Sequence, residues 1–189
     1  MMIYNAKSLR SKENLNNVEK KPGYYKWWAK ETEIETILTA LELSYSDTLQ
    51  KMEKCNIEGE EYYCIYIGIA IKESISQRLD WHINQNNTLS QIKNGTLSTF
   101  RRSIAAVVCC DLSDTQGTND FIDLLKVETF PLDLPVKTQE AKEEIQKIEK
   151  DLLNGKYLYL LNIQENKHPM APIKKLKQIR KMVGAKNIF

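Results

Sequence analysis

The apolar run CIYIGIAI, residues 64–71, constrains the fold more than any other stretch of this sequence. It is the longest uninterrupted apolar run, yet it is far shorter than the roughly 20 residues that a membrane-spanning helix requires. With the residues before it, the run forms EYYCIYIGIA, whose aromatic and β-branched side chains are typical of a strand. The sequence therefore predicts a soluble protein, with no membrane partner, built around a buried strand.

Side chains alternate between the two faces of a strand, so this segment has two predicted faces. One face carries Tyr63, Ile65, Ile67 and Ile69, and the other carries Tyr62, Cys64, Tyr66 and Gly68. The isoleucine face belongs to the core. Gly68 would let a ligand or another backbone approach Tyr66 closely. Alternatively, Tyr66 packs under the first helix.

A second strand is expected in KPGYYKWWAK, residues 21–30, where aromatic residues follow a Pro-Gly turn signal. Alternation groups Tyr25 with Trp27 and Tyr24 with Trp28, so the four rings are not equivalent.

The remaining pattern predicts one α+β domain over residues 21–189, preceded by a polar N-terminal arm at residues 1–20. A third strand is expected in YLYLLNI, and VETFPLDLP is expected at a sheet edge, because Pro131 cannot donate a ladder hydrogen bond. Apolar residues at helical spacing predict helices in ETEIETILTALEL, ESISQRLDWHINQ, TLSTFRRSIAAVV, NDFIDLLK, KTQEAKEEIQKIEKDLL and PIKKLKQIRKMV.

Charge and cysteine content restrict the function only weakly. The formal net charge of +2 indicates neither a polybasic nor an acidic partner. No CxxC pair is present, and neither His82 nor His168 has zinc-finger spacing from a cysteine pair, so a zinc site is not expected. The N-terminal residues lack the pattern of a secretory signal. Reduced cysteines in the cytoplasm are the simplest interpretation.

Several charged residues are candidates for a function. Arg78 and His82, at i and i+4, share one flank of a helix. The planar arginine side chain suits phosphate oxygens, and an imidazole can transfer a proton. Alternatively, an arginine in this position is usually solvated or paired with a carboxylate. Glu149 lies within the apolar arc of its helix, where a carboxylate must be paired, bound to a metal or face a cleft. Glu140, Glu143 and Glu144 instead form an ordinary solvated face.

Basic residues near the C-terminus could contact a nucleic-acid backbone, since lysine and arginine that displace counterions give sequence-independent affinity. A surface helix docked by its apolar residues explains the same pattern equally well. The same two alternatives apply to the arginine pair in TFRRSIAAV. The candidate contacts are Arg101, Arg102, Lys174, Lys175, Lys177 and Arg180.

Taken together, these segments resemble the GIY-YIG nuclease superfamily. The matching pieces, in the family's order, are PGYY (22–25), IYIG (65–68), RLDWH (78–82), EKDLL (149–153) and LN (161–162). The first motif has Tyr24 where an aliphatic residue is usual. A helix and a polar stretch separate the first two motifs, whereas compact members have only a short connection there. An insertion of this kind resembles some restriction-enzyme members and other stand-alone members. The resemblance implies a small three-stranded antiparallel sheet flanked by helices, with an inserted helix and a C-terminal basic helix.

The resemblance also implies hydrolysis of a DNA phosphodiester with one divalent cation, Mg²⁺ or Mn²⁺, held by Glu149. Tyr25 would be the general base, which requires nearby positive charge because a phenol has a pKa of about 10. The other implied roles are water positioning by Tyr66, phosphate binding by Arg78 and by Lys72, orientation or proton shuttling by His82, and support by Asn162 and Gly68.

Two other functions remain open from the sequence. One is a nucleic-acid-binding module that retains the fold without cleavage, for which the basic helix is the support. The other is a protein-interaction domain that uses Trp27, Trp28 and the inserted helix, and solvent-excluded positions for both Tyr25 and Glu149 would favour it.

Overall fold

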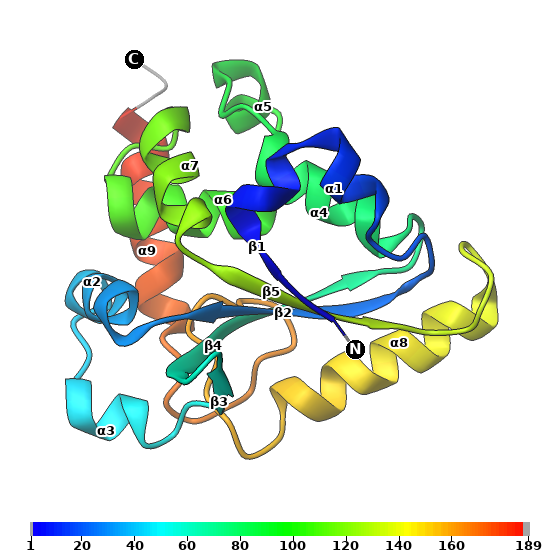
Figure 1. Ribbon diagram of the computed structural model, residues 1–189. Helices are drawn as coiled ribbons and strands as arrows, with labels where there is room; N and C mark the ends of the chain where they lie inside the picture. The colour runs from blue at the N-terminus through cyan, green and yellow to red at the C-terminus, as the bar shows by residue number, and fades with distance from the viewer. Residues whose placement is uncertain (1, 187–189) are drawn as a thin grey trace.

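A five-stranded antiparallel sheet, in the order β1-β5-β2-β4-β3, organises the computed structural model, which describes residues 2–186 (Figure 1). The strands are β1 (Met2–Asn5), β2 (Gly23–Ala29), β3 (Lys54–Ile57), β4 (Glu60–Ala70) and β5 (Lys126–Pro131). The α+β class is confirmed. The predicted three-stranded sheet is not, because β1, β3 and β5 join β2 and β4, while the predicted third strand does not form.

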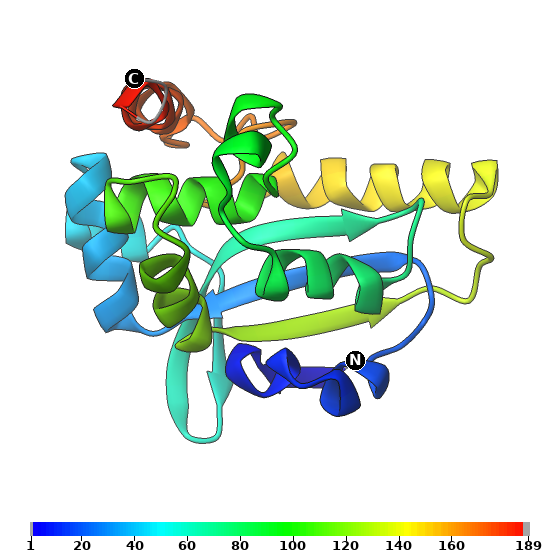
Figure 2. The same cartoon turned by 90° about the horizontal axis from the view of Figure 1, so that it is seen from above.

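Helices cover both faces of the sheet, with α4 and α6 on one face and α8 on the other (Figure 1). Viewed from above, the C-terminal helix α9 lies on the side of the molecule opposite the N-terminal segment (Figure 2). No helix in the described part of the chain is long and apolar enough to cross a membrane. The helical elements are η1 (Ala6–Arg10), α1 (Lys12–Asn16), α2 (Glu31–Leu41), α3 (Tyr45–Leu49), α4 (Ile75–Asn84), α5 (Leu89–Lys93), α6 (Thr99–Ile104), the π-helical η2 (Ala105–Cys109), α7 (Thr115–Asp123), α8 (Gln139–Leu153) and α9 (Ile173–Lys186).

The N-terminal segment is part of the fold, not an arm outside it. β1 pairs with β5, and the few apolar residues that follow it are buried, including Ala6 and Leu9. Arg10 donates hydrogen bonds to the Asp123 carboxylate and to the backbone oxygens of Ile83 and Asn119. A polar composition concealed these contacts because only a few side chains per turn of a short helix need to reach the core.

Two further strand predictions are wrong. β5 lies between β1 and β2 and not at an edge, since Pro131 is its last residue and leaves the ladder intact. The segment YLYLLNI is irregular apart from an isolated bridge between Met52 and Leu158, although residues 158–161 are fully buried. This segment covers the part of β4 that β3 does not pair with, and the backbone N–H of Leu161 donates to the carbonyl of Ile65.

A bulge in the β2–β4 pairing changes the predicted faces of β4. The register shifts between Trp27 and Trp28, whose partners are Tyr66 and Cys64, so Ile65 is the extra residue. Tyr66 consequently packs in the same core as Ile65, while Cys64 packs on the opposite side of the sheet. The simple alternation predicted from the sequence fails at this point.

The insertion between the first two motifs ends in a hairpin that the sequence analysis did not predict. β3 and β4 are joined by Glu58 and Gly59, which both have positive φ, at 57° and 88°. This is the backbone that a two-residue hairpin turn requires. The expected helix in the insertion is confirmed as α2.

Candidate active site

Tyr25 and Gly68 face each other across the central strand pair β2–β4. An ideal Cβ built on Gly68 would lie 2.2 Å from Cζ and Oη of Tyr25, far inside van der Waals contact. The Tyr25 ring therefore lies across the Gly68 backbone, and only glycine leaves it this space. The close approach predicted at Gly68 is made by a tyrosine ring from the neighbouring strand.

Helix α4 supplies the arginine and the histidine. It begins with a capping box, in which the Ser74 hydroxyl accepts from the Gln77 N–H and the Gln77 side chain accepts from the Ser74 N–H. Its apolar stripe is buried, which turns Arg78 and His82 toward β2 and β4 from one flank. The stripe consists of Ile75, Leu79 and Ile83.

A buried chain of hydrogen bonds connects α6 to the first motif. His82 Nε2 lies 2.6 Å from the Tyr25 hydroxyl, and His82 Nδ1 lies 2.7 Å from the Ser98 hydroxyl. Ser98 is also the N-cap of α6 and accepts from the backbone N–H of Arg101. Ser98 was not among the residues predicted from the sequence, because its contact with His82 joins two separate helices.

Both groups at the centre of this chain are uncharged at neutral pH. Burial, together with the Arg78 and Arg101 charges, holds the pKa of His82 well below its usual value. Burial and the nearby Tyr66 phenol raise the pKa of Tyr25 well above 10, and Arg78 lowers it only in part. The positive charge expected to favour a Tyr25 phenolate is therefore outweighed by burial.

Arg78 lies at the centre of the candidate site. Its Nη1 donates to the Glu73 carboxylate at 2.9 Å, and its guanidinium carbon lies 4.3 Å from the centroid of the Trp81 ring. Its Nε is buried and has no hydrogen-bond partner. Burial raises the pKa of Tyr66 to about 12, against the effect of the Arg78 charge. Arg78 is partly exposed, so its guanidinium can contact an incoming anion while it also acts on Tyr25.

Glu149 extends from α8 toward the same group of residues. Burial and the nearby Glu165 raise its pKa to about 7, although the Arg78 charge acts in the opposite direction. Glu165 was not predicted, because it lies in an irregular loop where it has a positive φ of 56° and no periodic pattern marks it. A search of the described residues finds no group of three or more His, Cys, Asp or Glu side chains that could hold a metal.

The carboxylate pair fits a hard cation that keeps most of its waters. Mg²⁺ prefers oxygen ligands and is often held by only one or two carboxylates. Glu149 and Glu165 supply this donor type, and the effect of Glu165 on the pKa of Glu149 places the two carboxylates near each other. The donors present therefore suit Mg²⁺ better than zinc, which takes more protein ligands, usually histidine or cysteine.

Asn162 stabilises β4 from outside the sheet. Its side-chain nitrogen donates to the Ile67 carbonyl at 2.8 Å, and its side-chain oxygen accepts from the Ile67 N–H at 2.9 Å. The amide thus makes the two hydrogen bonds that a neighbouring strand would make, and it fixes the backbone between Tyr66 and Gly68.

Comparison with protein families identifies the chain. The model of the GIY-YIG catalytic domain matches residues 23–182, which include both tyrosine motifs, α4 and Glu149. The chain belongs to the GIY-YIG family. Neither the curated proteins nor the solved structures contain a match. The family is one of nucleases, so a nucleic acid is the substrate that membership implies.

One predicted nucleic-acid contact of this GIY-YIG domain is a structural residue. Arg101 is fully buried, and its guanidinium donates to Asn87 Oδ1, to the His82 carbonyl and to Asn119 Oδ1. The RR pair in the sequence gave no sign that its first member points inward. Arg101 is therefore not available to nucleic acid.

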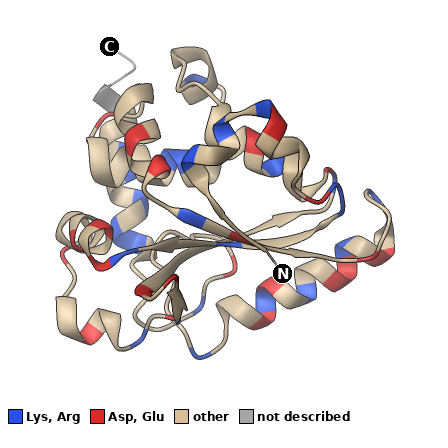
Figure 3. Cartoon of the chain, viewed as in Figure 1, with Lys and Arg blue, Asp and Glu red and all other residues tan. Residues whose placement is uncertain are grey.

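The other predicted contacts divide by position. Lys72 is exposed beside Arg78, Lys174 is exposed on α9, and Lys175 forms an ion pair with Glu42. Basic residues are frequent along α9, whereas α8 mixes both signs of charge (Figure 3). Only three of the predicted contacts line one groove, between α6 and α9: Arg102, Lys177 and Arg180.

The residues of the candidate site differ in their exposure to solvent. Tyr25 and His82 are fully buried and Tyr66 is 8% exposed, whereas Arg78 and Glu149 are both partly exposed. The GIY-YIG site therefore presents an arginine and a carboxylate to solvent and keeps its first tyrosine behind them.

Proposed function

We propose that this protein is an endonuclease that hydrolyses phosphodiester bonds in DNA with the help of one divalent cation, Mg²⁺ or Mn²⁺. The observation that carries the proposal is the position of Arg78, whose charge acts on the pKa of Tyr25, Tyr66 and Glu149. One charge perturbs several groups in this way when all of them lie near it. Two strands and two helices thus contribute to one site.

Arg78 binds the scissile phosphate through donors that Glu73 does not use. Glu149 and Glu165 hold the cation, which when bound polarises the phosphate and stabilises the leaving oxygen. Asn162 keeps β4 in place, so that Tyr66 can orient the attacking water by hydrogen bonding.

Tyr25 acts as a proton relay in this proposal and not as a preformed phenolate. The relay requires the His82 tautomer in which Nε2 accepts from the Tyr25 hydroxyl and Nδ1–H donates to Ser98. As Tyr25 takes a proton from water, it transfers its own proton to His82; because burial and the Arg78 and Arg101 charges make this imidazole a weak base, the transfer requires the negative charge of the bound phosphate at Arg78 to offset them. Because Tyr25 is fully buried, the relay operates only when substrate binding opens a path for water to its hydroxyl.

The test is cleavage of plasmid, single-stranded and branched DNA by the purified protein, with Mg²⁺ and with EDTA. Wild type should cleave at least one substrate only with the metal, and Glu149→Gln should lower the rate about 10²-fold or more, as loss of a group that stabilises transition-state charge does. Glu144→Gln removes the same charge from the exposed face of α8 and should cleave like wild type. Equal rates for Glu149→Gln and wild type would reject the assignment.

The complete burial of Tyr25 supports a second candidate function, a nucleic-acid-binding module that does not cleave. This protein would bind DNA with strong salt dependence and leave every substrate intact at all metal concentrations. The partial exposure of Glu149 argues against the third alternative, a protein-interaction domain, which was expected to exclude both groups from solvent.

A further inference from the structure

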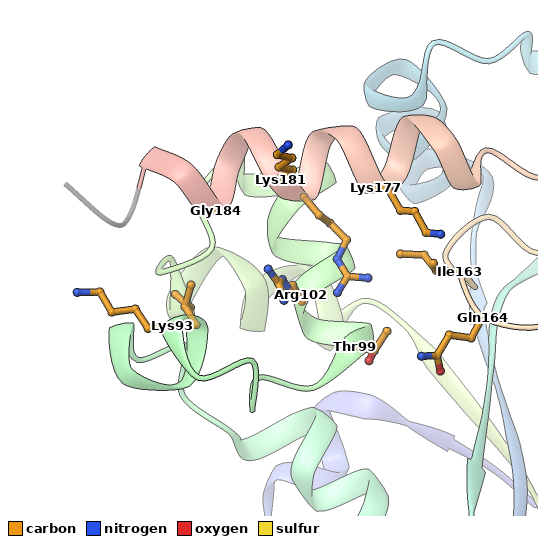
Figure 4. A pocket seen from close by; sticks show the side chains of 10 residues that line it. Lys93, Thr99, Arg102, Ile163, Gln164, Lys177, Lys181 and Gly184 are labelled. Carbon is orange, nitrogen blue, oxygen red and sulfur yellow. The ribbon is translucent and has the colours of Figure 1, made fainter.

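A groove with a volume of about 660 Å³ lies between α9, α6 and the loop that follows Asn162. Lys177 extends from α9 toward Ile163 and Gln164, and Arg102 lies beneath the same helix (Figure 4). The volume is within the range of small-molecule sites, so the groove can admit a phosphate with its sugar but not the width of a duplex.

The groove is positively charged throughout. Among the described residues no acidic side chain lines it, and its walls carry the five basic residues Lys93, Arg102, Lys177, Arg180 and Lys181. The remaining walls include apolar side chains such as Ile92 and Ile163. This combination suits a ligand with an anionic group and an apolar part.

Two of these arginines lie close together without a compensating charge. Burial and the neighbouring Arg102 charge together lower the pKa of Arg180 to about 10. The Nε of Arg102 is buried and lacks a hydrogen-bond partner. None of the ion pairs between described residues includes either arginine. Two like charges held together in this way are stabilised by an anion between them.

Three segments link the groove to the candidate active site, although Arg78 itself lines a separate hollow with Lys72 and Glu73. Thr99 in its wall follows Ser98, which contacts His82. Ile163 and Gln164 lie between Asn162 and Glu165 in the chain. From α9, the Arg180 charge lowers the pKa of Tyr66. A strand bound at Arg78 can therefore continue into the groove.

We propose that this groove binds a backbone phosphate of the DNA strand being cut, next to the scissile phosphate, with Arg102 and Arg180 as its main ligands. The proposal rests on the proposed function for the identity of the ligand. It assigns the rest of α9 a secondary role, because Lys174 lies outside the groove and Lys175 is paired.

The test is binding of fluorescein-labelled single-stranded DNA to the full chain, followed by anisotropy at several NaCl concentrations. The parent protein carries Glu149→Gln and is kept in EDTA, so cleavage cannot interfere. Adding Arg102→Gln and Arg180→Gln should weaken binding at least tenfold and reduce the slope of log K against log salt by about 0.7, since the groove holds one backbone phosphate and each phosphate contact contributes about 0.7 for single strands. Adding Lys7→Gln instead, which removes an exposed charge on η1, should leave the affinity and the slope unchanged.

An affinity and slope equal to those of the parent would overturn the proposal. Loss of folding is not expected, because the substitutions remove a repulsion, and circular dichroism checks it. Arg180→Lys keeps the charge and should retain the slope even if the double variant does not fold. A wild type that binds through the groove but never cleaves would reject the nuclease function and leave the groove assignment standing.

Discussion

Replacing Gly68 by alanine tests the most specific packing contact of the site. The new methyl group would lie 2.2 Å from Cζ and Oη of Tyr25, where ordinary contact begins near 3.4 Å. Because the backbone of Gly68 does not have the positive φ that disfavours other residues, the effect is purely steric. The Tyr25 ring must therefore move by about 1.2 Å, the difference between these two distances.

This movement has two costs. Overpacking of a buried site costs about 1–3 kcal/mol. A displacement of this size also breaks the 2.6 Å hydrogen bond between Tyr25 and His82, and leaving buried polar groups unpaired costs about 1–3 kcal/mol more. The free energy of unfolding should fall by about 2–6 kcal/mol in total, and any cleavage that depends on Tyr25 should fall with it.

Urea unfolding followed by tryptophan fluorescence measures the change, because Trp27 packs in the same core as Tyr25. The same substitution in a Tyr25→Ala background should cost little, since the ring that it meets is absent. Gly184→Ala is the matched control. Its Cβ would lie 3.4 Å from Leu112 Cδ1, an ordinary contact, and alanine is favoured over glycine within a helix such as α9.

Two outcomes would refute this reasoning. The first is a Gly68→Ala variant that unfolds at the same urea concentration as wild type. The second is an equal cost with and without the Tyr25 ring, which would place the strain elsewhere in β4.

Two further predictions concern the buried polar groups. The pKa of His82 is lowered in the folded state, so below about pH 6.5 the imidazole takes up a proton only in the unfolded chain. The free energy of unfolding therefore decreases as the pH is lowered. Measured by urea titration, the free energy of unfolding of wild type relative to that of His82→Gln should therefore decrease by about 1.4 kcal/mol from pH 7.5 to pH 5.5. A difference between the two proteins that stays the same at both pH values would contradict the burial of a neutral imidazole. Asn162→Leu leaves the N–H and carbonyl of Ile67 unpaired and should lower the free energy of unfolding by about 2 kcal/mol or more, whereas an unchanged midpoint would show that water replaces the amide.

Local patterns predicted the parts of the site that single elements carry. Helical spacing placed Arg78 and His82 on one flank of α4 and Glu149 in the apolar arc of α8, and these positions follow from side-chain geometry within one helix. Alternation grouped Tyr25 with Trp27 because it needs only one regular strand. The basic character of α9 was also evident from composition.

Contacts between distant segments were decided by the tertiary structure. The bulge at Ile65 turns Tyr66 into the core of Tyr25, and no residue within β4 alone specifies it. Glu165 acts on Glu149 from an aperiodic loop, and Arg101 turns inward because its acceptors lie on other elements. The sequence by itself determined which side chains share a face within the elements that it predicted, such as β2, α4 and α8. Only packing decided which of them meet, because hydrogen bonds and charges between distant segments leave no periodic trace in the chain.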